Sequence, residues 1–258
     1  MGVHHYSFRQ LCRCVQTNLT SDKGKILTLS KYVFPSYRDC VKNAEEVGIP
    51  LIIDEKFLDD KYSIDKVILK GLGFSQVDTM DYSVYEGADI AHDLNLPIPD
   101  EHKEKYDFVL DAGTIEHVFD LPQVLKNVFD ALKIGGIFFF DTPYWYHPHH
   151  GYYNCSPELF EDYFQANKWK ILRLQPYQCL SKESVEFQLG NNNAFPPMYG
   201  LLNGIVVKTD MTTHDVIPQQ GQYSTTWNRL DGIMVDIGKQ INAHHNVYIY
   251  LEPAKRCD

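Results

Sequence analysis

The chain has 258 residues and a formal net charge of -10, from 24 Lys and Arg against 34 Asp and Glu. This acidic balance opposes a surface that follows a nucleic-acid backbone, so we expect no nucleic-acid partner. No apolar run could span a bilayer, and six cysteines without a CxxC pair fit a reduced setting, so we expect a cytoplasmic protein without a membrane partner. The length suits one α/β domain with embellishments, and the oligomeric state stays open.

The N-terminal part contains two strand patterns and two helix patterns. Residues 1–23 show no sustained period, and we interpret them as a leader that packs on or caps the fold. A β-type run at 25–30 precedes helical spacing over 37–47. A second helix is predicted over 64–70 and a second strand over 74–80.

The rest of the chain continues the alternation of strands and helices. Strands are predicted at 88–91, 106–110, 137–140 and 169–174, and helices at 120–132 and 156–164, the latter starting at Ser156 as N-cap. Late strands at 204–208 and 246–251 would add an edge, and 190–200 and 209–227 resemble loops or a lid. This alternation predicts a Rossmann-like, doubly wound, mostly parallel sheet that is covered on both faces, with a C-terminal embellishment.

Acidic residues follow three of the predicted strands. Asp81 ends the second strand, Asp93 follows the third, and Asp111 follows the fourth. Ligands of open parallel sheets bind beyond the carboxyl ends of the strands, where carboxylates accept hydrogen bonds from ribose hydroxyls and from an adenine amine. A carboxylate there can also be a plain helix cap, but the ordered series favours a nucleoside pocket.

Three stretches carry a resemblance to a known family. The phrases DYSVYEGADIAHDLNLPIP, YDFVLDAGTIEHVFDLPQVLKNVFDALKIGGIFFFDTP and HGYYNCSPELFEDYF resemble class I S-adenosylmethionine-dependent methyltransferases. The resemblance extends over about residues 25–174 and implies a single methyltransferase-like domain over 1–258. In it, 1–23 is the leader, 24–176 the cofactor-binding core and 177–258 a substrate-side or lid region.

The resemblance also implies roles for individual residues. Asp81 corresponds to the acid that contacts the ribose hydroxyls of S-adenosylmethionine, and Asp93 to the residue that faces the adenine amine. Asp111 and Gly113 lie where the fourth strand delivers a loop beside the transferable methyl group. Glu116 and His117 follow in the same loop.

The Glu116-His117 pair resembles the pair found after that strand in small-molecule O-methyltransferases, where the histidine serves as base. A histidine suits this role because its pKa lies near neutrality. His150 is the second choice, since the HPHHGYY segment follows the fifth strand. Glu116 can alternatively be a residue of a helical first turn.

The turn after the first strand departs from the family pattern. It reads Ser30-Lys31-Tyr32-Val33-Phe34-Pro35 in place of a glycine-rich loop, whose missing Cβ atoms let the backbone approach the methionine part of the cofactor. Ser30 and Lys31 are expected to contact the cofactor carboxylate instead. A histidine cluster at 147, 149 and 150 could be interpreted as a metal site, since imidazole binds transition metals. Without a Cys pair or HExxH spacing, however, no metal site is expected.

These observations favour methyl transfer from S-adenosylmethionine to a small polar acceptor, such as a sugar hydroxyl or an amine. Aromatic residues around the histidine cluster would form an acceptor wall or pack in the core: Tyr144, Trp145, Tyr146, Tyr152 and Tyr153. The missing glycine turn supports an alternative, a non-catalytic binding or scaffold protein with this fold. A dinucleotide-dependent enzyme is opposed by the lack of a GxGxxG motif.

Overall fold

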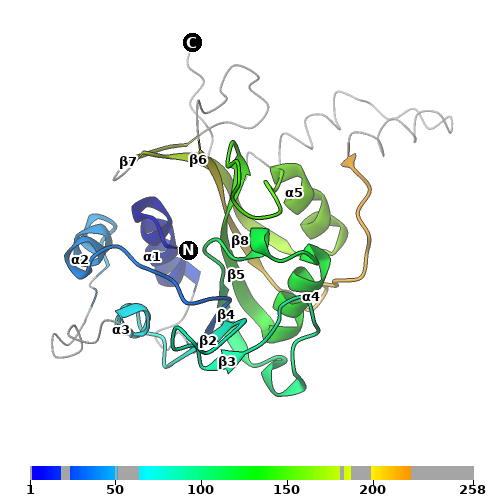
Figure 1. The fold of residues 1–258 in the computed structure, drawn as a ribbon, viewed down its shortest axis with the longest axis horizontal. Helices are drawn as coiled ribbons and strands as arrows, with labels where there is room; N and C mark the ends of the chain where they lie inside the picture. Colours follow the sequence, from blue (N-terminus) through cyan, green and yellow to red (C-terminus); the bar gives the residue numbers. More distant parts are fainter. Residues whose placement is uncertain are drawn as a thin grey trace, which may run out of the picture.

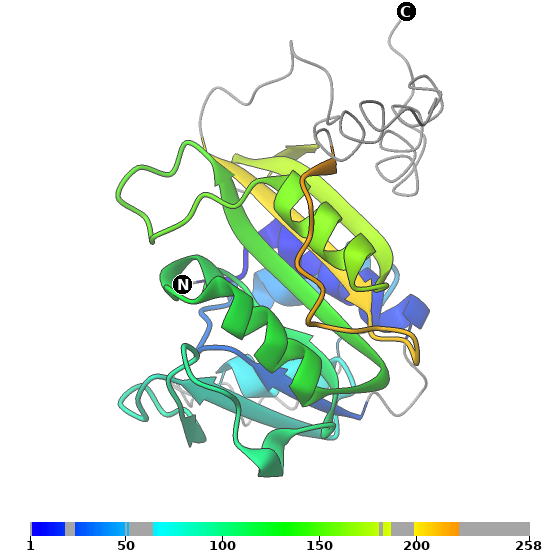
Figure 2. The same ribbon diagram turned by 90° about the vertical axis from the view of Figure 1, so that its right-hand side faces the viewer.

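A single mixed sheet organises the computed structural model, which describes residues 2–18, 24–49, 51, 64–180, 183–186 and 199–221. Its eight strands lie in the order β3-β2-β1-β4-β5-β8-β6-β7. Helices pack on both faces, so that the molecule has three layers (Figures 1 and 2). This arrangement confirms the Rossmann-like, doubly wound fold expected from the alternation of strands and helices.

The strands and helices have the following bounds. The strands are β1 (Lys25–Thr28), β2 (Gln76–Asp81), β3 (Ile90–Ala91), β4 (Tyr106–Leu110), β5 (Leu132–Trp145), β6 (Lys170–Leu180), β7 (Glu183–Glu186) and β8 (Gly200–Val207). The α-helices are α1 (His5–Asn18), α2 (Tyr37–Glu46), α3 (Ile64–Gly71), α4 (Leu121–Ala131) and α5 (Pro157–Ala166). Two short 3-10 helices, η2 (Asp100–His102) and η3 (Ile115–His117), precede and follow β4.

Side-chain caps start the helices that the sequence predicts. Ser36 accepts a hydrogen bond from the Asp39 amide at the start of α2, and Asp120 accepts one from Gln123 at the start of α4. Ser156 caps α5, as predicted. Each cap satisfies an amide that lacks a partner inside its helix.

Two hydrophobic clusters fill the space between the layers. One cluster joins α1, α2 and α3 to one face of the sheet, and the other joins α4 and α5 to the opposite face (Figure 1). The leader predicted over residues 1–23 contains α1, which packs on the sheet, but a helix was not predicted there. Its Phe8, Leu11, Cys12 and Val15 are buried at helical spacing, an amphipathic stripe that is already present in the sequence.

The C-terminal strands extend the sheet in an unexpected way. β8 is antiparallel to both β5 and β6 and lies between them, so the expectation that residues 204–208 add an edge is wrong. In this pairing Gly204 lies opposite Phe140, and a Cβ at Gly204 would lie 2.0 Å from the Phe140 ring, so glycine permits the position of β8. β5 and β6 are longer than predicted, β7 was not predicted, and the predicted strand at 246–251 lies outside the described residues.

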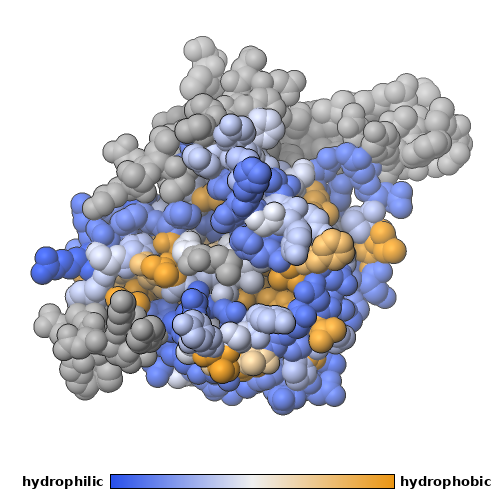
Figure 3. Space-filling model, viewed as in Figure 1, coloured by the Kyte–Doolittle hydropathy of each residue, from blue (hydrophilic) through white to orange (hydrophobic). Residues whose placement is uncertain are grey.

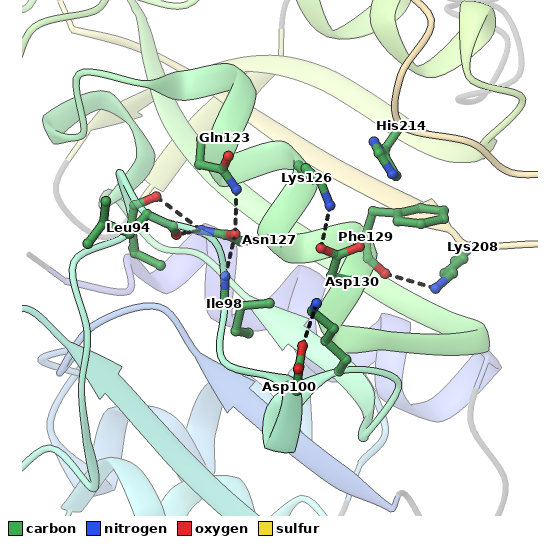
Figure 4. Close-up of polar contacts among 12 residues, drawn as sticks. Leu94, Ile98, Asp100, Gln123, Lys126, Asn127, Phe129, Asp130, Lys208 and His214 are labelled. Atoms are coloured by element: carbon green, nitrogen blue, oxygen red, sulfur yellow. Dashed lines mark hydrogen bonds and ion pairs between the residues drawn. The ribbon is translucent and has the colours of Figure 1, made fainter.

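Helix α4 holds the segment that follows β3. The buried Asn127 side chain accepts a hydrogen bond from the Ile98 amide at 2.9 Å and donates one to the Leu94 carbonyl at 3.0 Å. Gln123 donates to the same Asn127 oxygen at 2.8 Å (Figure 4). Because these bonds fix residues 94–98, they also fix the position of Asp93, which lies just before them.

The surface shown in Figure 3 is mostly hydrophilic, with separate hydrophobic patches rather than one continuous apolar area. Among the described residues, no helix combines the length and the apolar character that crossing a membrane requires.

Candidate functional site

The predicted carboxylates lie beyond the ends of neighbouring parallel strands. β2 pairs with β3 through Asp81 and Ala91, and β1 pairs with β4 up to Thr28 and Leu110. Since these strands run in the same direction, their carboxyl ends meet at one edge of the sheet. Asp81, Asp93 and Asp111 therefore share that edge.

Asp81 is held by the turn after β1. Its Oδ2 accepts hydrogen bonds from the Ser30 hydroxyl at 2.7 Å and from the Lys31 amide at 3.1 Å, and its Oδ1 accepts one from the Tyr82 amide at 2.7 Å. The Lys31 ammonium instead pairs with the buried Asp65 at 2.7 Å. A carboxylate has about four acceptor sites, and three of them are used here, so Oδ1 of Asp81 keeps capacity for one ribose hydroxyl.

Asp93 lies in an exposed turn. Its Oδ1 accepts hydrogen bonds from the Asn95 amide at 2.9 Å and from the Asn95 side chain at 2.7 Å. These bonds lower the pKa of Asp93, the backbone bond being the larger cause. Asp93 is therefore an ionised acceptor at neutral pH.

Asp111 is fully buried at the end of β4. Its Oδ1 accepts hydrogen bonds from the Thr114 amide at 2.9 Å and from the Tyr32 hydroxyl at 3.3 Å, and that hydroxyl also bonds Thr114 Oγ1 at 2.7 Å. Its Oδ2 has no hydrogen-bond partner among the described residues. Burial raises the pKa of Asp111 to about 7. Gly113 follows with a positive φ of 95°, which suits glycine.

Glu116 points into the protein from η3. Thr142 Oγ1 donates to its Oε2 at 3.4 Å, while its buried Oε1 forms no hydrogen bond within the described part of the chain. Burial, and then the negative charge of Asp111, raise the pKa of Glu116 to about 8. A buried acid with an unused oxygen is costly, so this position is unusual for a purely structural residue.

Two histidines face the unused oxygen of Glu116. His150 Nε2 lies 3.5 Å and His117 Nε2 lies 3.9 Å from Glu116 Oε1. The two rings are 4.8 Å apart and edge-to-face, and their side chains are 48% and 37% exposed, respectively. Burial, and then His150, lower the pKa of His117, which favours its neutral form. The structure thus brings together the three residues for which the sequence predicts catalytic roles.

The loop between β5 and α5 is bound to the backbone of Glu116. The Tyr152 and Tyr153 amides donate to the Glu116 carbonyl at 2.8 and 3.2 Å. A Cβ at Gly151, which has a φ of 74°, would lie 2.7 Å from that carbonyl, so glycine permits the approach. This docking places His150 beside His117 although the two are distant in sequence.

Two polar residues in this region were not predicted from the sequence. Tyr32 takes the place of the glycine turn and closes it over Asp111. Asp141 is buried in β5 and accepts hydrogen bonds from the hydroxyls of Ser7 and Tyr177. Burial raises the pKa of Asp141 to about 7. An acidic residue directly after the apolar run 137–140 was the available signal for Asp141.

Exposed aromatic side chains surround the histidines. Trp145, Tyr146 and Tyr152 are exposed, as an acceptor wall requires, and Phe119 lies edge-to-face against Tyr152 at 5.7 Å. Tyr199, from the segment before β8, lies 6.4 Å from Tyr146. Of the other predicted wall residues, Tyr144 and Tyr153 are partly buried against the core. His149 is exposed, and His147 packs beside His150 with ring centroids 5.7 Å apart.

Neither a known family model nor a curated protein matches the sequence. The chain is similar in fold to solved methyltransferases. One is the 1,6-didemethyltoxoflavin-N1-methyltransferase of Burkholderia thailandensis with bound S-adenosylhomocysteine, at 13% identity and a TM-score of 0.40 over 80% of this chain and 78% of that one.

Two further solved structures have the same kind of similarity. A variant of the 16S rRNA (adenine(1408)-N(1))-methyltransferase of Catenulisporales acidiphilia has 10% identity and a TM-score of 0.44, over 78% of this chain and 94% of that one. A methyltransferase of Thermotoga maritima has 16% identity and a TM-score of 0.37, over 79% of this chain and 89% of that one.

Proposed function

We propose that the protein transfers a methyl group from S-adenosylmethionine to a small polar acceptor. The observation that carries the proposal is the order of groups along one sheet edge: Asp81 and Asp93 after β2 and β3, then the buried Asp111 and Glu116 beside half-exposed histidines. Acceptors suited to a nucleoside thus lie at one end, and proton-handling groups lie at the other.

The adenosine half of the cofactor fits the first group of residues. Asp81 would accept a ribose hydroxyl, and Asp93 would accept the adenine amine. Tyr82, which follows Asp81 and is 78% exposed, offers an aromatic face for the adenine ring. Ser30 and Lys31 contribute by positioning Asp81 through the bonds described above.

The methionine half of the cofactor carries cationic groups, which fit the buried acids of the second group of residues. Asp111 Oδ2 accepts no hydrogen bond from the described residues, and a cationic sulfonium or ammonium group would compensate the charge of the carboxylate. Tyr32 replaces the glycine backbone as the wall on this side, and Gly113 gives the turn after β4 its positive φ. These carboxylates therefore suit a cationic nucleoside.

Bound S-adenosylmethionine supplies an electrophilic methyl group and leaves as the neutral thioether after transfer. This chain then has to align the acceptor, exclude water and remove the acceptor's proton. His117 Nε2 takes that proton, because its lowered pKa leaves the imidazole neutral and its side chain reaches the surface. Glu116 and His150 complete the cluster beside the imidazole.

The exposed aromatic residues support a small acceptor, such as a sugar hydroxyl or an amine, that stacks on one face. The net charge of -10 argues against a nucleic-acid acceptor. Residues 177–258 as the substrate-side or lid region, and the cytoplasmic setting, stay predictions.

A turnover assay tests the proposal. The full-length protein is incubated with S-adenosylmethionine and a panel of sugar, amine and phenol acceptors, and S-adenosylhomocysteine release is measured. Acceptor-dependent release that His117→Ala removes and His149→Asn retains is the expected result. Release that is equal in both variants would contradict the role of His117.

A second candidate is a binding protein that kept the fold without methyl transfer. It is favoured by Tyr32, whose buried ring occupies the turn that glycines form in the resembling family. This candidate predicts that neither S-adenosylmethionine nor S-adenosylhomocysteine binds, whereas the enzyme requires both to bind.

A further inference from the structure

Three side chains beside the proposed reaction site form a donor set for a metal ion. Glu116, His117 and His150 each direct one ligand atom into a common space, and these atoms lie within 4.8 Å of one another. We propose that these three residues bind a divalent transition-metal ion. Sequence spacing does not reveal this site, because His150 comes from a distant loop that docks on Glu116.

The distances require only small movements of exposed side chains. Glu116 Oε1 is 3.5 Å from His150 Nε2 and 3.9 Å from His117 Nε2. Two donors that are each about 2.1 Å from one ion in tetrahedral geometry lie roughly 3.4 Å apart. The two imidazoles must therefore close in slightly, and their partly exposed side chains, at 37% and 48% exposure, leave space for this movement.

Glu116 is the fixed point of the site. Its side chain is 1% exposed, and its Oε1 has no hydrogen-bond partner among the described residues. The Gly151 contact and the Tyr152 and Tyr153 amides hold its backbone. An unpartnered, buried carboxylate oxygen aimed at two imidazoles is the arrangement that a cation satisfies.

The surrounding charge also favours a cation. Asp111 and Asp141 are buried nearby, and their negative charges act on Glu116. In the described part of the chain, the only basic groups within 4 Å of the Glu116 carboxylate are the same two histidines. A divalent ion would compensate this acidic region without requiring protonated histidines.

The donor types select the class of ion. Two imidazole nitrogens and one carboxylate oxygen suit Zn²⁺, Fe²⁺, Mn²⁺ or Co²⁺, whereas Mg²⁺ and Ca²⁺ prefer oxygen ligands. Three protein ligands leave positions open, which is typical of ions that act on a substrate. The site would thus be accessible from the exposed side, where the aromatic wall lies.

The role of the ion rests on the proposed function. A bound ion would lower the pKa of an acceptor hydroxyl at an open position, so that the hydroxyl could release its proton to water before it attacks the methyl group. In the metal-bound protein His117 would be a ligand, and the ion would take over the proton removal that is assigned above to the free imidazole.

Cobalt provides a direct test of binding. The full-length, untagged protein is stripped of metal and titrated with Co²⁺, and the visible absorption of the bound ion is recorded together with the heat of Zn²⁺ binding. We expect one site per chain with saturable absorption bands, and a loss of Zn²⁺ affinity of at least about 10-fold in His150→Ala. His149→Asn is the matched control, because this exposed neighbour has a positive φ that asparagine tolerates.

Two results would overturn the inference. One is the absence of saturable Co²⁺ absorption in the parent protein, whose fold circular dichroism verifies. The other is an equal Zn²⁺ affinity in His150→Ala and His149→Asn. Cofactor binding by the metal-free protein is measured in parallel: if the cofactor binds and no metal does, the metal site fails alone; if the metal binds and no cofactor does, the proposed function fails alone.

Discussion

The carboxylates at the two ends of the candidate site differ in burial and in hydrogen bonding. Asp81 and Asp93 are partly exposed and accept hydrogen bonds from nearby amides, hydroxyls or an amide side chain. Asp111 and Glu116 are fully buried, and each has one oxygen without a partner among the described residues. Hydrogen bonds from Asn95 lower the pKa of Asp93, whereas burial raises the pKa values of Asp111 and Glu116 toward neutrality.

Under the proposed function, this contrast separates recognition from reaction. Acids that the fold has already satisfied can bind a neutral group such as a ribose at little cost. Acids left unsatisfied in the interior destabilise the fold unless a cation or a proton reaches them. We therefore assign the nucleoside to the Asp81 end and the charged, reacting groups to the Asp111 end, and the following predictions test this division.

The largest effect is expected at the reacting end. His117→Ala should reduce turnover by about 10²- to 10⁴-fold, the range for loss of a positioned acid–base group, with little change in cofactor affinity. We would measure the turnover rate and the S-adenosylmethionine affinity of His117→Ala, with His149→Asn as the control. A parallel loss of affinity in His117→Ala would move this residue to the recognition end.

The next effect concerns stability. Burial raises the pKa of Asp141 from its ordinary 3.8 to about 7, so the folded state keeps a proton that the unfolded chain releases. The contribution of Asp141 to stability is therefore greatest below about pH 4 and declines until about pH 7, by at most roughly 4 kcal/mol. The side chain of Asp141→Asn stays neutral, so the stability of this variant relative to the parent protein should increase as the pH rises.

Urea unfolding at pH 5 and at pH 8 measures this difference. The free energy of unfolding of Asp141→Asn relative to the parent protein should be larger at pH 8. A difference that is constant with pH would show that Asp141 is ionised in the folded state. Burial would then not raise the pKa of this acid.

A smaller effect is expected at the recognition end. Asp81→Ala should weaken S-adenosylmethionine binding by about 10- to 100-fold, as the loss of hydrogen bonds to a charged acceptor implies, and should leave the protein folded. Asp81→Asn keeps one acceptor and should give an intermediate affinity. Asp100→Ala is the control for a change in charge, because Asp100 is exposed and pairs with Lys103. Unchanged affinity in Asp81→Ala would remove this residue from the site.

The smallest effect is expected for Asp93. Its single contact with the adenine amine would contribute about 1 kcal/mol, so Asp93→Ala should weaken binding by a few-fold. Comparison of adenosine with inosine, which lacks the amine, sharpens the test: the variant should bind the two alike. A variant that still prefers adenosine would place the amine elsewhere.

The sequence predicts the strand ends better than the loops. The positions of Asp81, Asp93 and Asp111 follow from short apolar runs, each of which ends at an acid, and β4 has the predicted bounds. By contrast, the approach of His150 to Glu116 depends on Gly151 and on two backbone hydrogen bonds. Such long-range contacts leave no periodic pattern.

The same reason explains the other differences. Tyr32 and Asp141 look like a loop residue and a strand end, and only packing shows that both are buried. α1 was not predicted, because its buried stripe is short and includes Cys12 among large apolar residues. The place of β8 in the middle of the sheet depends on the pairing of Gly204 with Phe140, which glycine permits, and these residues are far apart in the chain.

The most direct test is calorimetric titration of the full-length protein with S-adenosylmethionine and, separately, with S-adenosylhomocysteine. The account predicts that both bind with micromolar affinity, despite Tyr32 in place of the glycine turn. Absence of binding heat for both ligands at several temperatures, from a protein that circular dichroism shows to be folded, would contradict a cofactor site at this sheet edge and favour the non-catalytic binding protein.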